Sequence, residues 1–281
     1  MNDIRLLALD IDGTILTNEK KLTDRTKAAI EAAADAGIAI SLVTGRPFFG
    51  IPDELLSLKG LGYVISSNGA VTTDLAQNRI LRTATLESET AIEIISVPRR
   101  YDLVYAVFID GVGYSELEPL ERHIRMIDNP GIETYIRKSR RITYDMDGVI
   151  RFAPHGVENI WFICHDRNER DMLSHEISDK WNIRTVVTWK TDVEIGNPEA
   201  DKGLAIKALA ASLGIGKNEV MAIGDNGNDI GMLKAAGIAV AMGNAEDEVK
   251  SIADMVTGSN EEDGVAMVIE KLIASGTAQK K

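Results

Sequence analysis

The sequence predicts an α/β protein with a Rossmann-like core, in which a parallel sheet has helices on both faces, and with an inserted α+β domain. Two patterns predict this class. Short apolar runs alternate with helical segments near both ends of the chain, and such alternation produces parallel sheets. The middle of the chain has β-rich runs and helices without this alternation. We therefore predict a core formed by residues 1–84 and 190–281, with the inserted domain at 85–189.

The elements of the first segment follow from apolar runs and capping residues. Thr23 is a suitable N-cap for a helix over about residues 24–36, and Gly37 is a suitable residue to end it. Pro47 stands where the first turn of another helix would begin. Short, mostly apolar runs are expected of strands buried on both faces, and they occur at 4–9, 38–43 and 63–66.

The last segment repeats this order, and the middle differs from it. In the last segment we expect strands at 220–223, 238–242 and 254–256, and helices at 203–212, 246–253, 265–273 and up to Ala236. In the inserted domain we expect strands at 104–109 and 183–189, helices at 116–127 and 169–180, and Trp161 and Trp189 in its core. Glu194–Gly196 is interpreted as the linker back to the core, with hinges near 83–86 and 188–191.

The composition excludes several classes of partner. The chain has 281 residues and a formal net charge of −12, so its surface repels phosphate backbones and anionic membranes. We therefore expect neither a nucleic acid nor a membrane as a partner. The single cysteine cannot form an internal disulfide and suits a reducing compartment. Because the N-terminus lacks the long apolar stretch of a signal peptide, we expect a cytoplasmic protein, whose oligomeric state the sequence does not indicate.

The rare reactive residues are unevenly distributed. All four histidines and the cysteine lie between residues 120 and 190. Chemistry in the predicted core must therefore use carboxylates, hydroxyls, lysine, arginine and backbone groups. This excludes a phosphohistidine, a cysteine nucleophile or a histidine-rich transition-metal site there.

Two carboxylates directly follow the first predicted strand, in the segment Asp10–Thr14. Ligands in open α/β sheets bind at the carboxyl ends of the strands, which is where this segment stands. In an extended segment Asp10 and Asp12 point to the same side, where they repel each other unless a cation lies between them or one holds a proton. A simple Asp-Gly turn is the alternative.

Three further element ends carry polar residues. Thr44 and Gly45 precede Arg46 and Pro47 and combine a hydroxyl, a free N–H and a helix N-terminus, which can bind an anion or only cap the helix. Lys202 starts a helix, where its charge opposes the dipole and favours a nearby anion, although a surface lysine there is also ordinary. The segment Gly224–Asp229 brings two acids to another strand end, or forms an Asn-Gly turn.

The combination is more specific than any single motif. Carboxylates clustered with other oxygen donors suit a hard divalent ion, above all Mg²⁺. These four motifs, in this order, resemble the haloacid dehalogenase-like hydrolases. The long insertion between Thr44 and Lys202 resembles the cap domain of their sugar-phosphatase-like, Cof-type subgroup, as do Ser67–Ala70 and Ala241–Ala245.

The resemblance implies a two-step phosphoryl transfer. By this resemblance Asp10 is the nucleophile, Asp12 is the general acid and base, and Thr44 and Lys202 stabilise the transferring phosphoryl group. The Mg²⁺ would be held by the Asp10 side chain, the Asp12 backbone carbonyl and Asp225, with Asp229 in or next to that shell. The positions implied to lie near the substrate or its phosphate are Gly45, Arg46, Asn197 and Asn228.

The resemblance leaves more than one function open. An acid at Asp12 indicates a phosphatase or a phosphomutase, and we favour a phosphatase of small phosphorylated metabolites such as sugar phosphates. A mutase needs a second cationic phosphate site, for which Arg137–Arg141 is the candidate, although this stretch can also be merely solvated. The same acids could form a non-catalytic Mg²⁺-dependent phosphoacceptor switch. A switch has no need of a cap that excludes water.

Overall fold

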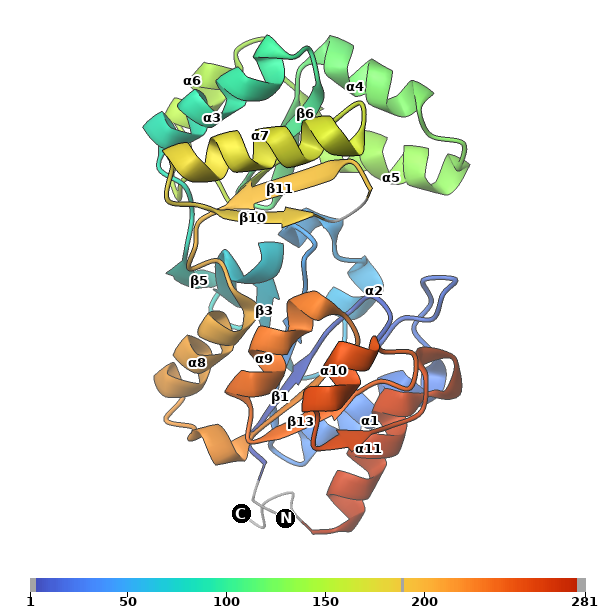
Figure 1. The fold of residues 1–281 in the computed structure, drawn as a ribbon. Helices are drawn as coiled ribbons and strands as arrows, with labels where there is room; N and C mark the ends of the chain where they lie inside the picture. Colours follow the sequence, from blue (N-terminus) through green and yellow to red (C-terminus); the bar gives the residue numbers. More distant parts are fainter. Residues whose placement is uncertain (1–3, 188–189, 277–281) are drawn as a thin grey trace. The chain divides into compact units, whose positions relative to one another are not determined.

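The computed structural model describes residues 4–187 and 190–276 and divides the chain into two compact units (Figure 1). The first, here called the core unit, comprises Met1–Gly45, Ile51–Arg82 and Asp201–Lys281. The second, here called the inserted unit, comprises Arg46–Gly50 and Thr83–Ala200. The fold class predicted from the sequence, a parallel-sheet α/β core with an inserted α+β unit, is confirmed.

The core unit is built on one sheet with the strand order β14-β13-β12-β1-β2-β3-β4-β5. The strands from β14 to β3 are parallel, and β4 returns antiparallel to β3. All four residues of β1 are fully buried, because helices cover both faces of the sheet at its centre. The strands are β1 (Leu6–Leu9), β2 (Ala39–Val43), β3 (Leu61–Ser66), β4 (Val71–Asp74), β5 (Arg79–Thr83), β12 (Val220–Gly224), β13 (Ile238–Ala241) and β14 (Met255–Val256).

The helices of the core unit pack in two groups. From β1 the chain proceeds to β2 on one side, and from β12 to β13 on the other. Right-handed crossovers therefore place α1 and α9 on opposite faces of the sheet. α1 packs on α11, and α9 packs on α8 (Figure 1). The helices are α1 (Asp24–Asp35), α2 (Asp53–Leu56), α8 (Lys202–Ser212), α9 (Ile230–Ala235), α10 (Asp247–Ile252) and α11 (Gly264–Ala274).

Helix α1 shows how local sequence sets an element. The Thr23 side chain accepts a hydrogen bond from the Thr26 backbone N–H, which satisfies one of the free donors of the first turn. Ala29, Ile30 and Ala33 form its buried face. Gly37 has a φ of 88°, a conformation that glycine adopts without strain. The predicted cap and the predicted end of this helix are both confirmed.

The inserted unit has its own sheet, mostly antiparallel, in the order β10-β11-β9-β6-β7-β8. One face of this sheet packs on α3, α6 and α7 through a core that includes Ile94, Ile150, Leu173 and Phe162. The strands are β6 (Val104–Ile109), β7 (Val112–Ser115), β8 (Arg140–Ile142), β9 (Asn159–Ile163), β10 (Arg184–Val187) and β11 (Asp192–Gly196). The helices are α3 (Ser88–Arg100), α4 (Leu117–Arg125), α5 (Pro130–Ser139), α6 (Met146–Arg151) and α7 (Arg167–Lys180).

Three expectations for the inserted unit are wrong. The segment Glu194–Gly196 is no linker, because it lies in β11 and pairs with both β9 and β10. The unit consequently continues to Ala200 rather than ending at 189. Trp161 is outside the core of the unit, since Ile160 and Phe162 on either side of it face that core. Trp189 lies outside the described residues.

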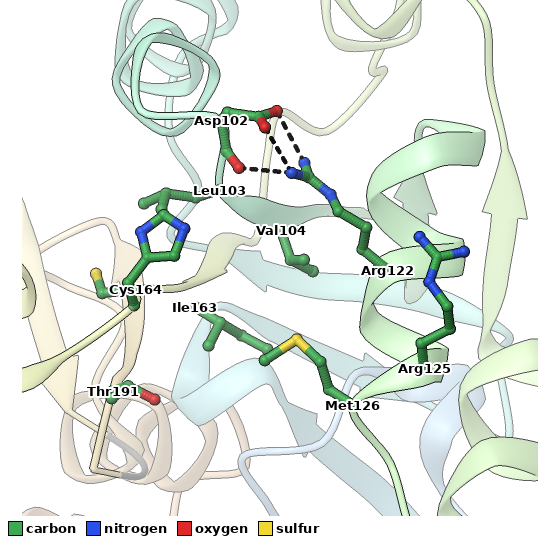
Figure 2. A pocket seen from close by; sticks show the side chains of 10 residues that line it. Asp102, Leu103, Val104, Arg122, Arg125, Met126, Ile163, Cys164 and Thr191 are labelled. Atoms are coloured by element: carbon green, nitrogen blue, oxygen red, sulfur yellow. Dashed lines mark hydrogen bonds and ion pairs between the residues drawn. The ribbon is translucent and has the colours of Figure 1, made fainter.

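A pocket of about 550 Å³ in the inserted unit is lined by residues from the end of α4, the start of β6 and the end of β9 (Figure 2). Cys164 lines it and is buried, which raises the pKa of its thiol to about 12. The Asp102 carboxylate holds Arg122 in the pocket wall with hydrogen bonds of 2.7 and 3.0 Å. Because of its raised pKa, the Cys164 thiol stays neutral near pH 7, so Cys164 is a structural residue and not a nucleophile.

Among the residues that the structure describes, no helix has the length and apolar character needed to cross a membrane.

Candidate active site

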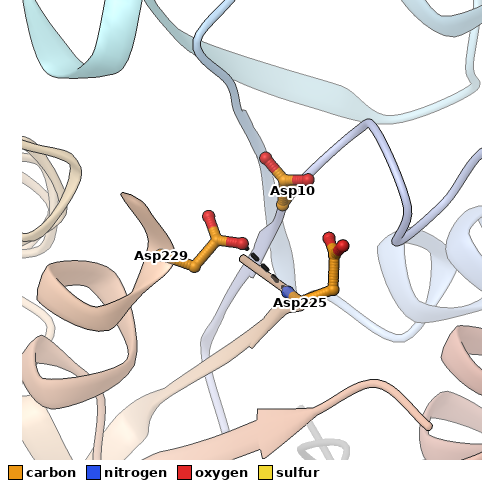
Figure 3. A group of neighbouring side chains, drawn as sticks. All are labelled: Asp10, Asp225 and Asp229. Carbon is orange, nitrogen blue, oxygen red and sulfur yellow. Dashed lines mark hydrogen bonds between the residues drawn. The ribbon is translucent and has the colours of Figure 1, made fainter. Parts of the chain in front are cut away.

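Three neighbouring strands of the core sheet end at the same edge, and each is followed by a polar residue. Asp10 follows β1, Thr44 follows β2, and Asp225 follows β12. Because the three strands are parallel, their carboxyl ends deliver these side chains to one place. Figure 3 shows Asp10 beside Asp225 and Asp229, with Asp229 coming from the short turn before α9.

A buried lysine binds this acidic cluster. Lys202 is the first residue of α8 and is 1% exposed. Its Nζ donates to Asp10 Oδ1 at 2.7 Å and to Asp229 Oδ1 at 2.6 Å. Asp229 is fully buried, and its other oxygen accepts hydrogen bonds from the backbone N–H groups of Asp225 and Asn226. Asp229 thus fixes both the lysine and the loop that carries Asp225.

The charges in the cluster do not balance. Three carboxylates face one ammonium group, so the formal charge is −2 when all four are ionised. Burial, together with repulsion by Asp229, raises the pKa of Asp10 well above its ordinary value despite the contact with Lys202. Burial also raises the pKa of Asp225 to about 6, although its hydrogen bond with Thr14 acts in the opposite direction. The cluster therefore needs another positive charge when its acids are ionised.

The donor set fits a divalent cation. One oxygen from each of Asp10, Asp225 and Asp229 lies within 4.8 Å of the others. Carboxylate oxygens are the ligands that hard divalent ions prefer, and an ion among them would supply the missing positive charge. The aspartate triad is consistent with a divalent-metal site.

The remaining residues of the first motif lie around this cluster. The Thr14 hydroxyl donates to Asp225 Oδ1 at 2.9 Å, so the turn after β1 positions an acid from the turn after β12. The Asp12 carboxylate is outside the triad and forms an ion pair of 2.8 Å with Lys20, where both side chains are partly exposed. Sequence reasoning missed Lys20, because a lysine eight residues after an aspartate carries no signal of its own.

Gly13 provides a test of how tightly this turn is built. Its φ is 82°, and a Cβ atom there would overlap Asp225 Oδ2. We expect Gly13→Ala to lower the free energy of unfolding by about 1–3 kcal/mol and to displace Asp225. Gly37→Ala is the matched control, since Gly37 has a φ of 88° and open space around it. Urea unfolding should show a loss in both variants. Only Gly13→Ala should also lose the thermal stabilisation by a divalent metal, and equal stabilisation of both would contradict the crowding at Asp225.

Asn68, to which sequence reasoning assigned no function, connects the second motif, at Thr44–Pro47, with the fourth, at Gly224–Asp229. Asn68 Oδ1 accepts a hydrogen bond of 3.0 Å from Asn228 Nδ2, and the Asn68 backbone N–H donates to the Thr44 carbonyl. The side chain of Asn68 also packs against Gly45. The sequence held a signal for Asn68, because this residue follows the third predicted strand and the argument from strand ends applies to it as well. Asn244 likewise connects two motifs, since its side chain donates to the Gly13 carbonyl at 2.8 Å.

Two predicted substrate residues belong to the inserted unit and have partners there. Arg46 Nη1 donates to the Gly50 carbonyl at 2.8 Å. Asn197 Nδ2 donates to the Thr85 carbonyl at 2.8 Å, and its Oδ1 accepts from the Glu199 backbone N–H at 2.8 Å. Asn197 therefore ties together the two segments through which the chain enters and leaves this unit. Contact of either residue with a substrate stays a prediction.

Two residues of the basic stretch considered for a second phosphate site, Arg137 and Arg140, have partners in the inserted unit. Arg137 forms ion pairs with Glu133 at 2.9 Å and with Glu121 at 3.3 Å. The Arg140 guanidinium lies over the Phe108 ring, 4.5 Å from its centre. The charge of Arg137 is thus neutralised by carboxylates, which is poor preparation for a second phosphate group.

Comparisons with known proteins agree with this geometry. Residues 7–269 match the family described as haloacid dehalogenase-like hydrolase. The chain is 30% identical to the 5-amino-6-(5-phospho-D-ribitylamino)uracil phosphatase YwtE of Bacillus subtilis, over 96% of this chain and 99% of that protein. It is 28% identical to the pyridoxal phosphate phosphatase YbhA of Escherichia coli, over 94% and 97% of the two chains. The solved structure of a haloacid dehalogenase-like hydrolase from Bacteroides thetaiotaomicron matches with a TM-score of 0.83 and 26% identity, over 96% and 99% of the two chains.

Proposed function

Because the chain belongs to the haloacid dehalogenase-like hydrolases of the Cof-type subgroup and is a phosphoric monoester hydrolase of that family, we propose that it hydrolyses small phosphorylated metabolites through an aspartyl phosphate on Asp10. The observation that best supports this proposal is that the buried Lys202 forms ion pairs with Asp10 and Asp229, next to Asp225. Burying a lysine with two acids beside the half-buried Asp225 costs desolvation energy, and such clusters are typical of functional sites.

In the first step Asp10 attacks the phosphorus. Lys202 binds Asp10 Oδ1, so we assign the attack to Asp10 Oδ2. A bond forms from this oxygen to phosphorus, and the ester P–O bond breaks. Asp12 gives its proton to the leaving alcohol oxygen. Lys202 and Thr44, together with backbone N–H groups such as that of Gly45, stabilise the charge on the phosphoryl oxygens.

In the second step water releases the phosphate. Asp12, now a carboxylate, takes a proton from the water molecule, whose oxygen bonds to phosphorus while the Asp10–phosphorus bond breaks. Inorganic phosphate leaves, and Asp10 returns to its starting state. Asp10, Asp225 and the Asp12 backbone carbonyl would hold Mg²⁺, with Asp229 in or next to its shell. When bound, this ion neutralises the acids and lets an anionic phosphate approach them.

The printed names of two relatives support a proposal for the substrate class. One relative is named as a phosphatase of 5-amino-6-(5-phospho-D-ribitylamino)uracil and another as a phosphatase of pyridoxal phosphate. Their leaving groups differ, while the phosphomonoester is common to both. We therefore assign small phosphomonoesters, sugar phosphates or similar metabolites, to this chain. In this proposal the inserted unit forms the substrate-specificity cap, Arg46, Asn197 and Asn228 lie near the substrate, and the protein works in the cytoplasm.

Repeated turnover tests this function. With Mg²⁺ and an aryl phosphate in large excess, the purified protein should release many equivalents of inorganic phosphate. Release that stops near one equivalent would instead indicate a phosphoacceptor switch. Conversion of a hexose 1-phosphate to its 6-phosphate with a bisphosphate activator, without free phosphate, would indicate a mutase. The engaged Arg137 argues against the mutase.

Metal removal should abolish the activity reversibly. We expect treatment with EDTA to lower the rate by at least about a hundredfold, because three acids would then repel the phosphate with only Lys202 to oppose them. Mg²⁺ should restore the rate. The treated protein should remain folded, as far-ultraviolet circular dichroism can check. Full activity after exhaustive chelation would contradict the metal dependence.

A further inference from the structure

The turn after β3 has an unusual backbone. Ser67, Asn68 and Gly69 have φ values of 49°, 56° and 98°, so three successive residues are in the left-handed region. For the two residues that are not glycine, such conformations cost about 1–3 kcal/mol each and persist only where the surroundings require them. Ser67 is 2% exposed and Asn68 is 9% exposed, so the turn is inside the protein. Its contacts should therefore show what the strain serves.

Asn68 connects the second motif, which follows β2, with the fourth motif, which follows β12. Its backbone N–H donates to the Thr44 carbonyl at 3.0 Å, and its Oδ1 accepts from Asn228 Nδ2 at 3.0 Å. A Cβ atom on Gly45 would lie only 3.1 Å from Asn68 Oδ1, so the absence of a side chain at Gly45 lets the Asn68 amide pack there. Asn68 thus lies between the loop after β2 and the turn after β12.

The turn is also fixed from its other side. A Cβ atom on Gly69 would overlap the backbone carbonyl of Asp201, so the turn packs directly on the start of α8. Asp201 caps this helix by accepting from the Leu204 backbone N–H at 2.9 Å, and Lys202 is its first residue. Arg82 Nη1 donates to the Gly69 carbonyl at 2.7 Å. The position of Asn68 is therefore set by the helix that carries Lys202.

We infer that Asn68 is a positioning residue that orients the amide of Asn228 for a substrate phosphate. This inference rests on the proposed function. An amide nitrogen has two N–H groups, and Asn68 takes one of them, which leaves the other in a fixed direction for a phosphate oxygen. Asn68 itself acts through Asn228 and touches no reacting atom. Its loss should therefore weaken phosphate binding more than it slows the chemical step.

Asn68→Gly is the variant that isolates the side chain, because glycine keeps the left-handed backbone. Against an aryl phosphate with Mg²⁺, we expect KM and the inhibition constant of inorganic phosphate to rise about tenfold together, and kcat to change less than threefold. Asn78→Gly is the matched control: Asn78 has a φ of 47° but is exposed in the turn between β4 and β5. This control should leave both constants unchanged. Values for Asn68→Gly within twofold of the wild type overturn the inference.

A double-mutant cycle tests whether Asn68 acts through Asn228. Asn228→Ala should raise KM and the phosphate inhibition constant, and adding Asn68→Gly to it should raise them less than twofold further. A full multiplicative effect would show that Asn68 acts independently and would overturn the inference. The proposed function fails separately: if Asp10→Asn remains active, the nucleophile is wrong whatever the Asn68 variants do. If Asp10→Asn is inactive and Asn68→Gly is normal, only the positioning role fails.

Discussion

Asp10→Asn should abolish turnover and yet leave the metal-free protein at least as stable as the wild type. The asparagine side chain has nearly the same shape as aspartate, but its amide cannot attack phosphorus and form an acyl phosphate. We expect kcat to fall by on the order of a thousandfold or more, as when other enzymes lose a nucleophile. Phosphate release and trapping of a labelled phosphoenzyme measure this loss directly. Hydrolysis equal to that of the wild type would refute the nucleophile.

The stability half of this prediction follows from linkage. Folding raises the pKa of Asp10, chiefly by burial and then by repulsion from Asp229. An acid whose pKa is higher in the folded state is harder to ionise there, so ionised Asp10 destabilises the fold at any pH well above its ordinary pKa. Asparagine removes this cost, while Lys202 keeps its contact with Asp229. Without metal at pH 7, the thermal midpoint of Asp10→Asn should therefore be equal to or higher than that of the wild type.

Asp74→Asn is the matched control for this variant. Asp74 is 6% exposed, similar to the 5% of Asp10, and its Oδ1 accepts from the Gln77 backbone N–H at 3.0 Å. An asparagine oxygen can keep that contact. The control should therefore retain wild-type kcat, and its thermal midpoint should not rise. An equal loss of activity in both variants would indicate a general defect rather than a missing nucleophile.

The convergence of the acids at one edge of the sheet could be predicted because it depends on topology. Asp10, Thr44 and Asp225 each follow an apolar run, and parallel strands bring their carboxyl ends together. Lys202 carried only a weak sequence signal, the opposition of its charge to a helix dipole. In the structure it makes the shortest ion pair of the triad, at 2.6 Å to Asp229. Burial gives the lysine its importance, and burial of one side chain is not readable from its neighbours in sequence.

The features that could not be predicted depend on backbone conformation or on pairing between distant segments. The left-handed turn at Asn68 has serine and asparagine at positions where glycine is usual, and its Gly69 packs against Asp201, which is distant in sequence. The segment Glu194–Gly196 reads as a linker because it is short and ends in glycine. It is a strand because β9 and β10 flank it, and neither partner is adjacent to it in sequence.

Lys202→Met should have the second large effect, on activity and on stability together. Lys202 is 1% exposed and donates to both Asp10 and Asp229. Burial alone would lower the pKa of Lys202, but attraction by these two carboxylates raises it overall above its ordinary value, so the charged lysine stabilises the fold at pH 7. Methionine fills a similar volume without a charge. We expect kcat/KM to fall by on the order of a thousandfold, because in the proposed mechanism Lys202 stabilises the charge on the phosphoryl group.

The stability of Lys202→Met should depend on metal in a diagnostic way. Removing one partner of a buried ion pair leaves uncompensated charge and costs about 3–5 kcal/mol. In EDTA the variant should therefore unfold at a clearly lower temperature than the wild type. Mg²⁺ bound among Asp10, Asp225 and Asp229 would supply part of the missing positive charge, so it should raise the thermal midpoint of the variant more than that of the wild type.

Lys207→Met separates this effect from the loss of any lysine in the same helix. Lys207 lies on α8 and is exposed, so its replacement should change neither the activity nor the metal-dependent stabilisation. If Lys202→Met kept its activity within tenfold, the lysine would not stabilise the phosphoryl group. If Mg²⁺ stabilised Lys202→Met no more than the wild type, the ion would not share the acids that Lys202 binds. Both results together would place the metal and the lysine at different carboxylates. If they shared one acidic cluster, removing the lysine charge would strengthen the binding of the metal ion there.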